Sequence, residues 1–258
     1  MRMNLMAAPD IRKAAPRAVV LLPLGSTEQH GPHLGVSTDS TLVTAVAEGV
    51  EGAVPDDVLL CPTLAVGSSH HHLGFGALSI APETYARAVA DLIDCLQRWD
   101  APRILILNGH GGNIVPAKQA LNELAARDNL KSLVAFTSYW ELDAAFTGKP
   151  PMESARLSHA CEYETSMMLH VLPEAVNLKK ARRAKHPPGN AYIDWDKEPY
   201  RGVSTGMPFH QITSIGNCGQ PDKGTPKKGA YLVGAAVKAV TALVQSFKTW
   251  PLPEDMRE

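Results

Sequence analysis

The sequence has few cysteines, few aromatic residues and no strong excess of charge. Four cysteines among 258 residues lack C-x-x-C spacing, which argues against a disulfide framework or a thiolate zinc site and suggests reduced packing residues. The formal net charge is -1 at pH 7, and the longest basic run is the short stretch KKARRAK at 179–185. We therefore expect neither nucleic acid nor an anionic membrane as a partner, and small or neutral ligands fit better.

Long apolar runs are also missing. No apolar stretch approaches the roughly 20 residues that a bilayer span needs, and residues 1–17 lack the continuous apolar core of a signal peptide. We expect a cytoplasmic protein. A chain of 258 residues, of which 45% are hydrophobic and 20% charged, is long enough for one sizeable core, and we predict a single domain over 1–258.

Apolar strands alternate with amphipathic helices along the chain. Strands are predicted within 17–25, 57–67, 103–107 and 131–140, and helices over about 39–50, 84–99 and 229–247, with another after residue 113. This order predicts an α/β fold, a mostly parallel sheet with helices on both faces. The segment at about 180–228 is rich in proline, glycine and aromatics, which indicates an irregular excursion that forms a substrate lid or a subunit contact.

Acidic and imidazole side chains follow the predicted strands. In a parallel sheet, ligands bind outside the carboxyl ends of the strands, so the fold should gather these groups at one edge. Packed together, such groups repel one another and lose hydration unless a cation balances them. The groups are Glu28, His30, His70, His71, His72, His110 and the aromatic Trp140.

Three of these residues suit a metal site together with Asp39, which lies at the start of the next predicted helix. Glu28, His30, Asp39 and His110 form a nitrogen and oxygen ligand set for Zn or Mn. The carboxylate content favours two ions, because a carboxylate such as Asp39 can bridge metals ~3.5–4 Å apart. Glu28 and His30 stand two apart, so in an extended segment their side chains share a face.

Two further motifs allow simpler explanations. In an extended chain His70, His71 and His72 would alternate faces, so we expect only His72 to face a substrate pocket. The stretch NGHGGN at 108–113 could instead be a phosphate-binding turn at a helix N-terminus, although no Walker lysine accompanies it.

The stretch SHACEYETSMMLH at 158–170 carries further candidates. If it is helical, Glu164 projects into the apolar face and must be paired or neutralised. His159 and Glu162 are three residues apart, so on a helix they would reach together into the site. The alternative is a solvated surface pair, with Glu164 hydrogen-bonded to backbone amides.

The sequence contains the motifs LPLGSTEQHGPHLGVSTD, NGHGG and HACEYETS in this order. Together they resemble the creatininase family of metal-dependent amidohydrolases, and the shorter stretches SYW and KKG also fit the pattern of that family. The resemblance covers nearly the whole chain. It implies a three-layer αβα fold, two Zn or Mn ions, hydrolysis of a non-peptide C–N bond in a cyclic amide or formamide, and a homo-oligomer, often a hexamer. It also implies metal ligands at Glu28, His30, Asp39 and His110, with Asp39 bridging, an acid/base at His159 and a substrate cover at Trp140.

The sequence departs from creatininase proper at two places. Creatininase has a glutamate ligand at the position of Gly112 in this chain, and it has an apolar residue at the position of Glu162 in this chain. We therefore expect Glu162 to supply the missing ligand, with Glu164 in a supporting role. The turn HLGFGALSI at 72–80 is one residue shorter than usual and lacks its proline. The pattern looks more like the branch with the formamide deformylases and the mycofactocin precursor peptidase.

The resulting hypothesis is a metal-dependent amidohydrolase. Two ions would activate a water molecule for attack on the amide, and His159 would protonate the departing nitrogen. Within the same family, a short-peptide or precursor-peptide metallopeptidase is the alternative. A metal-storage protein and a nucleotide-binding module are the rivals from other classes.

Overall fold

The computed structural model describes residues 1–127, 130–195 and 203–254. Its main sheet has four parallel strands, as predicted, and they lie in the order β3-β1-β5-β6. The register pairs Val20 with both Leu59 and Ile104, which places β1 and β5 in the middle. The bounds are β1 Val19–Leu24, β3 Val58–Leu60, β5 Arg103–Asn108 and β6 Leu133–Ser138.

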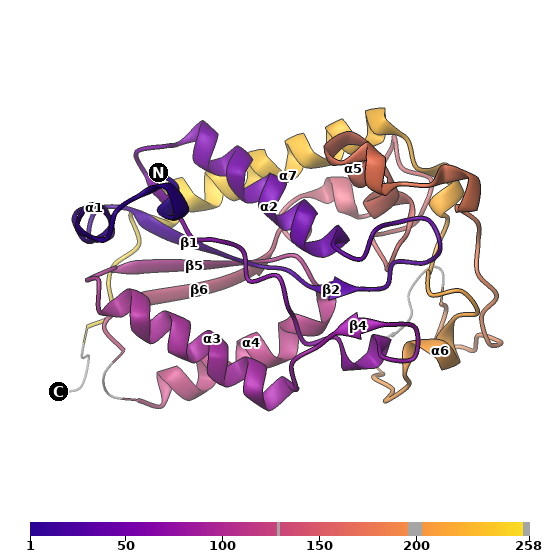
Figure 1. Cartoon of the computed structure of the whole chain (residues 1–258), viewed down its shortest axis with the longest axis horizontal. Helices are drawn as coiled ribbons and strands as arrows, with labels where there is room; N and C mark the ends of the chain where they lie inside the picture. The colour runs from indigo at the N-terminus through magenta and orange to yellow at the C-terminus, as the bar shows by residue number, and fades with distance from the viewer. Residues whose placement is uncertain (128–129, 196–202, 255–258) are drawn as a thin grey trace.

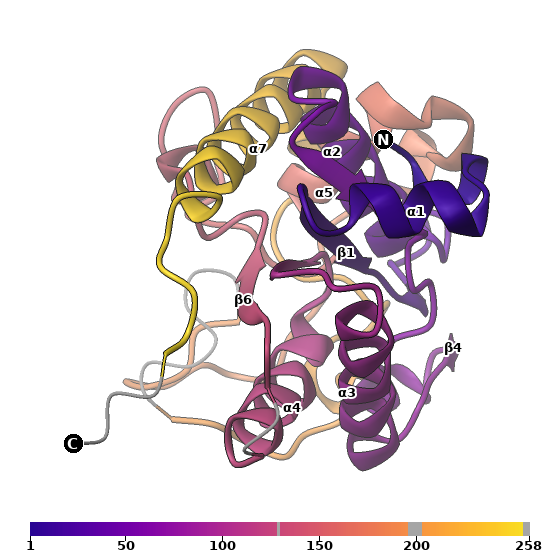
Figure 2. The same cartoon turned by 90° about the vertical axis from the view of Figure 1, so that its left-hand side faces the viewer.

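Helices cover both faces of this sheet (Figures 1 and 2). On one side lie α2 (Thr38–Ala53), α5 (Glu162–Val171) and α7 (Pro226–Phe247), and on the other α3 (Pro82–Gln97) and α4 (Ile114–Ala125). Because successive strand residues point to opposite faces, Val19 and Leu21 enter one apolar core, and Val20 and Leu22 enter the other. The predicted α/β fold with two helical layers is confirmed.

The last helix, predicted at about 229–247, begins at Pro226. By length and composition α7 could cross a membrane, so the statement that no stretch approaches that length is wrong here. Its buried stripe includes Leu232, Ala236 and Val240, and α7 packs against α5 and α2.

Several smaller elements were not predicted. Helix α1 (Ala8–Ala14) precedes β1, and β2 (Thr27–Glu28) pairs antiparallel with β4 (Ala77–Leu78). The described part of residues 180–228 contains the short helix α6 (Phe209–Ile212) and a 3₁₀ turn at Pro221–Lys223. At its two ends it overlaps the turn at Leu178–Lys180 and the first residues of α7. The remaining described residues belong to no helix or strand, which fits an irregular excursion. Residues 196–202 of that prediction lie outside the described residues. Three cysteines are buried, but Cys95 is exposed and is not a packing residue.

Candidate metal centre

The predicted ligands meet at the carboxyl end of the sheet, on the side of β2 in Figure 1. Glu28 ends β2, Asp39 lies in the first turn of α2, and His110 follows β5. Glu28 and His30 are fully buried, and Asp39 and His110 are nearly so. The fold therefore brings residues that are up to 82 positions apart into one buried cluster.

The ligand atoms of this cluster face one another at short range. Asp39 Oδ1 lies 3.1 Å from His30 Nε2, and Asp39 Oδ2 lies 3.1 Å from His110 Nδ1. Glu28 Oε2 is 3.2 Å from His110 Nε2, and Glu28 Oε1 is 3.1 Å from His72 Nε2. Asp39 thus directs one oxygen to each imidazole, which supports the bridging role expected from the sequence.

Two buried carboxylate oxygens in the cluster accept no hydrogen bond. They are Glu28 Oε1 and Asp39 Oδ2, although each lies near a histidine nitrogen. Leaving such an atom unsatisfied is costly, and a cation among these ligand atoms would satisfy both. The donor set therefore fits divalent metal ions. Among the described residues, ligand atoms within 4.8 Å of one another form four groups: Glu28–His30–Asp39, His30–His159–Glu164, Glu28–His71–His110 and Glu28–His72–His159.

Glu162 does not join this cluster. Its buried carboxylate accepts hydrogen bonds from Ser154 N at 2.6 Å and Lys228 Nζ at 2.6 Å, and also from Glu153 N. These groups already satisfy it, so the expectation of a metal ligand at Glu162 does not match the structure. Glu164 lies closest to that role, with Oε1 4.0 Å from His30 Nε2.

The reason lies in where α5 begins. The helix starts at Glu162, so His159 precedes it and the predicted helical pairing of His159 with Glu162 does not form. Between them Ala160 has a φ of 49°, in the left-handed region, which turns the chain before the helix. The Glu164 carboxylate accepts a hydrogen bond from the Ala160 amide and so holds this turn in place.

His159 presents one ring nitrogen to the cluster. Its Nε2 lies 2.8 Å from the carbonyl oxygen of Gln29, which can only accept, and 3.0 Å from the Gln29 side-chain nitrogen; we assign the proton to Nε2 from the shorter of these two contacts. Its Nδ1, 3.6 Å from Glu28 Oε1, is then free to accept a proton. Burial, together with the neighbouring His30 and His72, holds the pKa of His159 well below its usual value. A neutral base suits the predicted acid/base role.

The histidine triplet differs from its prediction. His70–His72 form a 3₁₀ turn, in which successive side chains rotate by about 120° instead of alternating. His71 and His72 therefore both reach the cluster, and His70 turns away to Ser79, 2.6 Å from its hydroxyl. His71 stacks on His110 with ring centroids 5.7 Å apart. The sequence predicted only His72 at the pocket, and His71 is an addition that the structure makes.

Gly112 stands where the resemblance places a glutamate ligand, and the structure leaves no room for one. A Cβ there would lie 2.2 Å from the Ser68 carbonyl oxygen, 2.4 Å from His110 Nε2 and 2.7 Å from His71 Cε1. Part of the space of the missing side chain is thus taken by His71.

Gln29 is a second residue at the site that was not predicted from the sequence. Its side-chain amide donates to the Gly216 carbonyl oxygen at 2.9 Å and lies 2.8 Å from His72 Nδ1, and its Oε1 accepts from the Gly31 amide. Gln29 therefore ties the 180–228 excursion to the histidines of the cluster. Its position between Glu28 and His30 in sequence was the available signal.

The pKa values show how the cluster balances its charge without metal. Burial alone would lower the pKa of His30 and His110, but the adjacent carboxylates raise these values to about 10 and about 9. Burial, with the charges of Asp39 and Glu28, raises the pKa of Glu164 to about 7. Burial would raise the pKa of Asp39, but His30 and His110 lower it. Protonated imidazoles thus stand where metal cations would balance the carboxylates.

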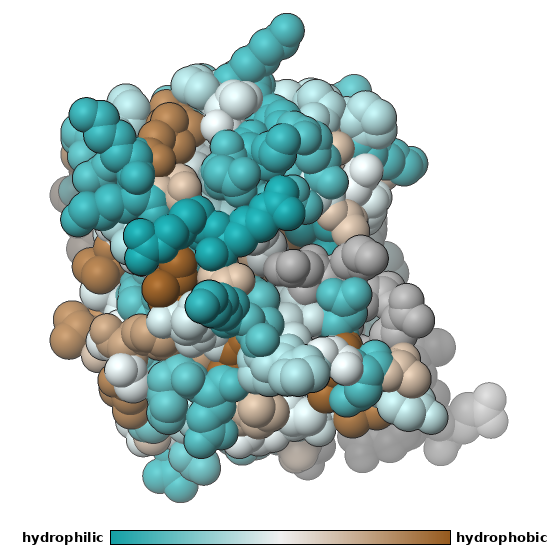
Figure 3. Space-filling view, turned by 90° about the vertical axis from the view of Figure 1, so that its right-hand side faces the viewer, coloured by the Kyte–Doolittle hydropathy of each residue, from teal (hydrophilic) through white to brown (hydrophobic). Residues whose placement is uncertain are grey.

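A pocket of about 400 Å³ opens onto the cluster. Its lining joins ligand residues such as Glu28, Asp39 and Glu164 to Trp140 and Arg156. Trp140 therefore lies where the resemblance implies a substrate cover. The surface at this end of the molecule is mostly hydrophilic, with separate small hydrophobic patches (Figure 3).

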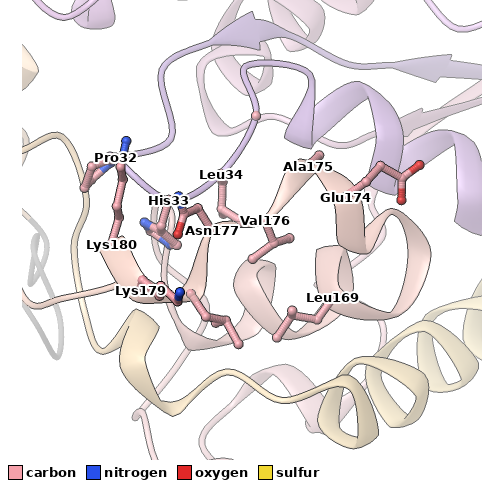
Figure 4. Close-up of a pocket in the computed structure, with 12 residues that line it drawn as sticks. Pro32, His33, Leu34, Leu169, Glu174, Ala175, Val176, Asn177, Lys179 and Lys180 are labelled. Atoms are coloured by element: carbon pink, nitrogen blue, oxygen red, sulfur yellow. The ribbon is translucent and has the colours of Figure 1, made fainter.

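A larger hollow of about 720 Å³ lies beside the 32–35 loop and contains no member of the cluster. His33 and Asn177 lie side by side in it, and Leu34, Val176 and Leu169 also line it (Figure 4). His33 is held by Thr165, with 2.9 Å between its Nε2 and the hydroxyl. The pocket at the cluster, and not the larger hollow, is therefore the candidate reaction site.

A parallel α/β sheet with a buried carboxylate and imidazole cluster at its carboxyl end defines a metal-dependent hydrolase. The chain belongs to the creatininase family, because the family model described as creatinine amidohydrolase matches residues 4–244.

Known relatives agree with this assignment. The chain is 32% identical to the mycofactocin precursor peptide peptidase of Mycobacterium tuberculosis H37Rv over 84% of its own length and 81% of the relative's. The peptidase of Mycolicibacterium smegmatis is 36% identical, but the match spans only 61% of this chain and 60% of the relative. The creatinine amidohydrolase of Pseudomonas putida is 28% identical over 92% of each chain.

Solved structures show the same fold. A structure named "Creatininase Mn" superposes with a TM-score of 0.78 at 22% identity and covers 96% of this chain and 99% of that one. Another structure in this group is a Zn-Zn type creatininase variant, with a TM-score of 0.76. Manganese and zinc thus both occur in the names of these structures.

Proposed function

We propose that this protein is a two-metal hydrolase that cleaves an amide bond in a short peptide. The observation that carries the proposal is the buried set of Glu28, His30, Asp39 and His110, in which two carboxylate oxygens accept no hydrogen bond. Zn or Mn ions held by these residues would supply a polarised amide carbonyl and a water of lowered pKa. Glu164 is the proposed fifth ligand, in place of Glu162.

His159 moves the proton in this proposal. Its Nδ1 faces the cluster, and its protonated Nε2 is fixed by the Gln29 carbonyl. In the neutral state favoured by its lowered pKa, Nδ1 can take a proton from the attacking water and pass it to the departing amine. Trp140 and Phe209 form apolar walls of the pocket beside this reaction centre.

A peptide substrate is favoured over a small cyclic amide by the relatives. The mycobacterial peptidases are 32% to 36% identical to the chain, and the creatinine amidohydrolase is 28% identical. The cavity of about 400 Å³ also falls within the roughly 300–1,000 Å³ typical of sites for drug-sized ligands. Hydrolysis of a cyclic amide or formamide is the second candidate, favoured by the 92% coverage of the creatinine amidohydrolase.

Mass spectrometry of products tests the proposal. Metal-free protein is reloaded with Zn or Mn and offered short peptides, formamides and lactams, and we expect cleavage of peptides only when metal is present. His159→Gln should reduce kcat by about 10²- to 10⁴-fold with unchanged metal content. His170→Gln, at an exposed position near the end of α5, is the matched control. Cleavage confined to lactams or formamides would favour the second candidate. If none of the peptides, formamides or lactams is cleaved in a metal-dependent way, both candidates are refuted.

A further inference from the structure

Arg156 is a cation at the reaction pocket without an anionic partner among the described residues. It lines the pocket together with Glu28, Asp39 and Glu164. Its Nε is buried and makes no hydrogen bond, and no ion pair of Arg156 is found in the part of the chain that the structure describes. Burying a guanidinium nitrogen without a partner is costly, so the arrangement favours a ligand that supplies an acceptor.

The backbone around Arg156 is fixed on both sides. Two residues before it, the amide of Ser154 donates to the Glu162 carboxylate at 2.6 Å. One residue after it, the amide of Leu157 donates to the Phe146 carbonyl oxygen at 3.4 Å. Three residues after it stands His159, which faces the cluster. The guanidinium therefore extends from a backbone segment that is held close to the reaction centre, so ligand binding requires little ordering of that backbone.

The charge of the loaded pocket points to the same kind of ligand. The three carboxylates that line it are those of Glu28, Asp39 and Glu164. Two divalent ions would carry four positive charges against these three negative ones, and Arg156 adds a further positive charge. A positive pocket with a planar guanidinium suits a carboxylate, which accepts two parallel N–H bonds from arginine.

We infer that Arg156 binds a carboxylate of the substrate and so orients the neighbouring amide toward the metal cluster. This inference rests on the proposed peptide hydrolysis and names its substrate class as peptides that carry a carboxylate near the scissile bond. Arg156 is a specificity-determining residue in this arrangement. The carboxylate comes either from a free C-terminus or from an acidic side chain.

Three tripeptide series test the inference on metal-loaded protein: free C-terminus, amidated C-terminus, and amidated C-terminus with an internal Asp or Glu. The natural protein should prefer one of the carboxylate series over the neutral one in kcat/KM by at least about 30-fold, the effect of losing one partner of a buried charge pair. Arg156→Gln should abolish that preference, and Arg156→Lys should restore part of it. Arg87→Gln, on the exposed side of α3, should keep it.

The same peptides are titrated by calorimetry into natural protein and Arg156→Gln, so that peptides that bind without being cleaved also report on Arg156. The inference would be overturned if the natural protein had the same kcat/KM for all three series, or if Arg156→Gln lowered kcat/KM equally for all three. Either result would leave the proposed peptide hydrolysis standing. An absence of metal-dependent cleavage beside a retained, Arg156-dependent preference in binding would overturn the proposed function and support the carboxylate site.

Discussion

Replacing Glu162 by glutamine separates a structural role from a metal-binding one. The Glu162 side chain is fully buried and lies 2.6 Å from Lys228 Nζ, whose side chain is 12% exposed. Removing one partner of a buried ion pair typically costs about 3–5 kcal/mol. Two features reduce that cost here. Lys228 also reaches Glu153 at 3.1 Å, and glutamine keeps an acceptor oxygen for the Ser154 amide.

We therefore expect Glu162→Gln to lower the free energy of unfolding by about 2–3 kcal/mol, below the usual range for a buried pair. For a chain of this size, that loss corresponds to a fall in Tm of about 5–10 °C. Metal content should not change. Calorimetric melting and elemental analysis measure the two quantities on one sample, with Glu123→Gln on the exposed side of α4 as the control.

The dependence on pH and a double mutant sharpen this test. Burial would raise the pKa of Glu162, but its bonds to Lys228 and Ser154 lower it, so its stabilisation is present above about pH 4.3 and is lost as pH falls through the lowered value. The gap between natural and variant protein should close in acid. In a Glu162→Gln/Lys228→Met cycle, the two losses should not add. Loss of metal with an unchanged Tm would show that the reasoning is wrong and that Glu162 is a ligand.

Three further predictions concern the cluster itself. Asp39→Asn should remove both ions together, because each carboxylate oxygen faces a different histidine, and elemental analysis that still finds one ion per chain would exclude the bridging role. Because His30 and His110 have pKa values raised to about 10 and about 9, metal-free protein should lose stability as pH rises from about 6.5 to 10, while metal affinity rises over the same range; an affinity independent of pH would contradict this. Gly112→Ala should cost about 1–3 kcal/mol through overpacking, since its Cβ would meet the Ser68 carbonyl oxygen at 2.2 Å, whereas Gly111→Ala has open space and serves as the control.

The fold was largely predictable because burial governs it. The four apolar strands and the helices at 38–53, 82–97 and 226–247 were expected within a few residues, since continuous apolar runs and helical spacing report which surfaces are covered. Helix α1 and the β2–β4 pair are too short to leave such a pattern. Within the cluster, Glu28, His30, Asp39 and His110 were found because residues after parallel strands share one edge.

The errors at the site were errors of local geometry. The choice of Glu162 rested on the ligand missing at Gly112 and on a helical pairing of Glu162 with His159, but Ala160 is left-handed and the helix begins only at Glu162. The exclusion of His71 assumed an extended chain, and the 3₁₀ turn invalidates the alternation on which it depended. Both outcomes depend on backbone conformations that neighbouring contacts impose, and spacing along the sequence does not report those contacts.

Anchoring the metal ligands and shaping the pocket are tasks of different parts of this molecule. Glu28, Asp39 and Glu164 lie on regular elements, and His30 and His110 each come two residues after a strand, whereas Trp140, Arg156 and Phe209 project from segments outside the main sheet and its long helices. Loops tolerate insertion and replacement better than buried strands. A loop grafted at Trp140 or Phe209 should therefore change the substrate that the pocket accepts while the proposed metal ligands stay in place, which makes this protein a practical scaffold for engineering amide hydrolysis.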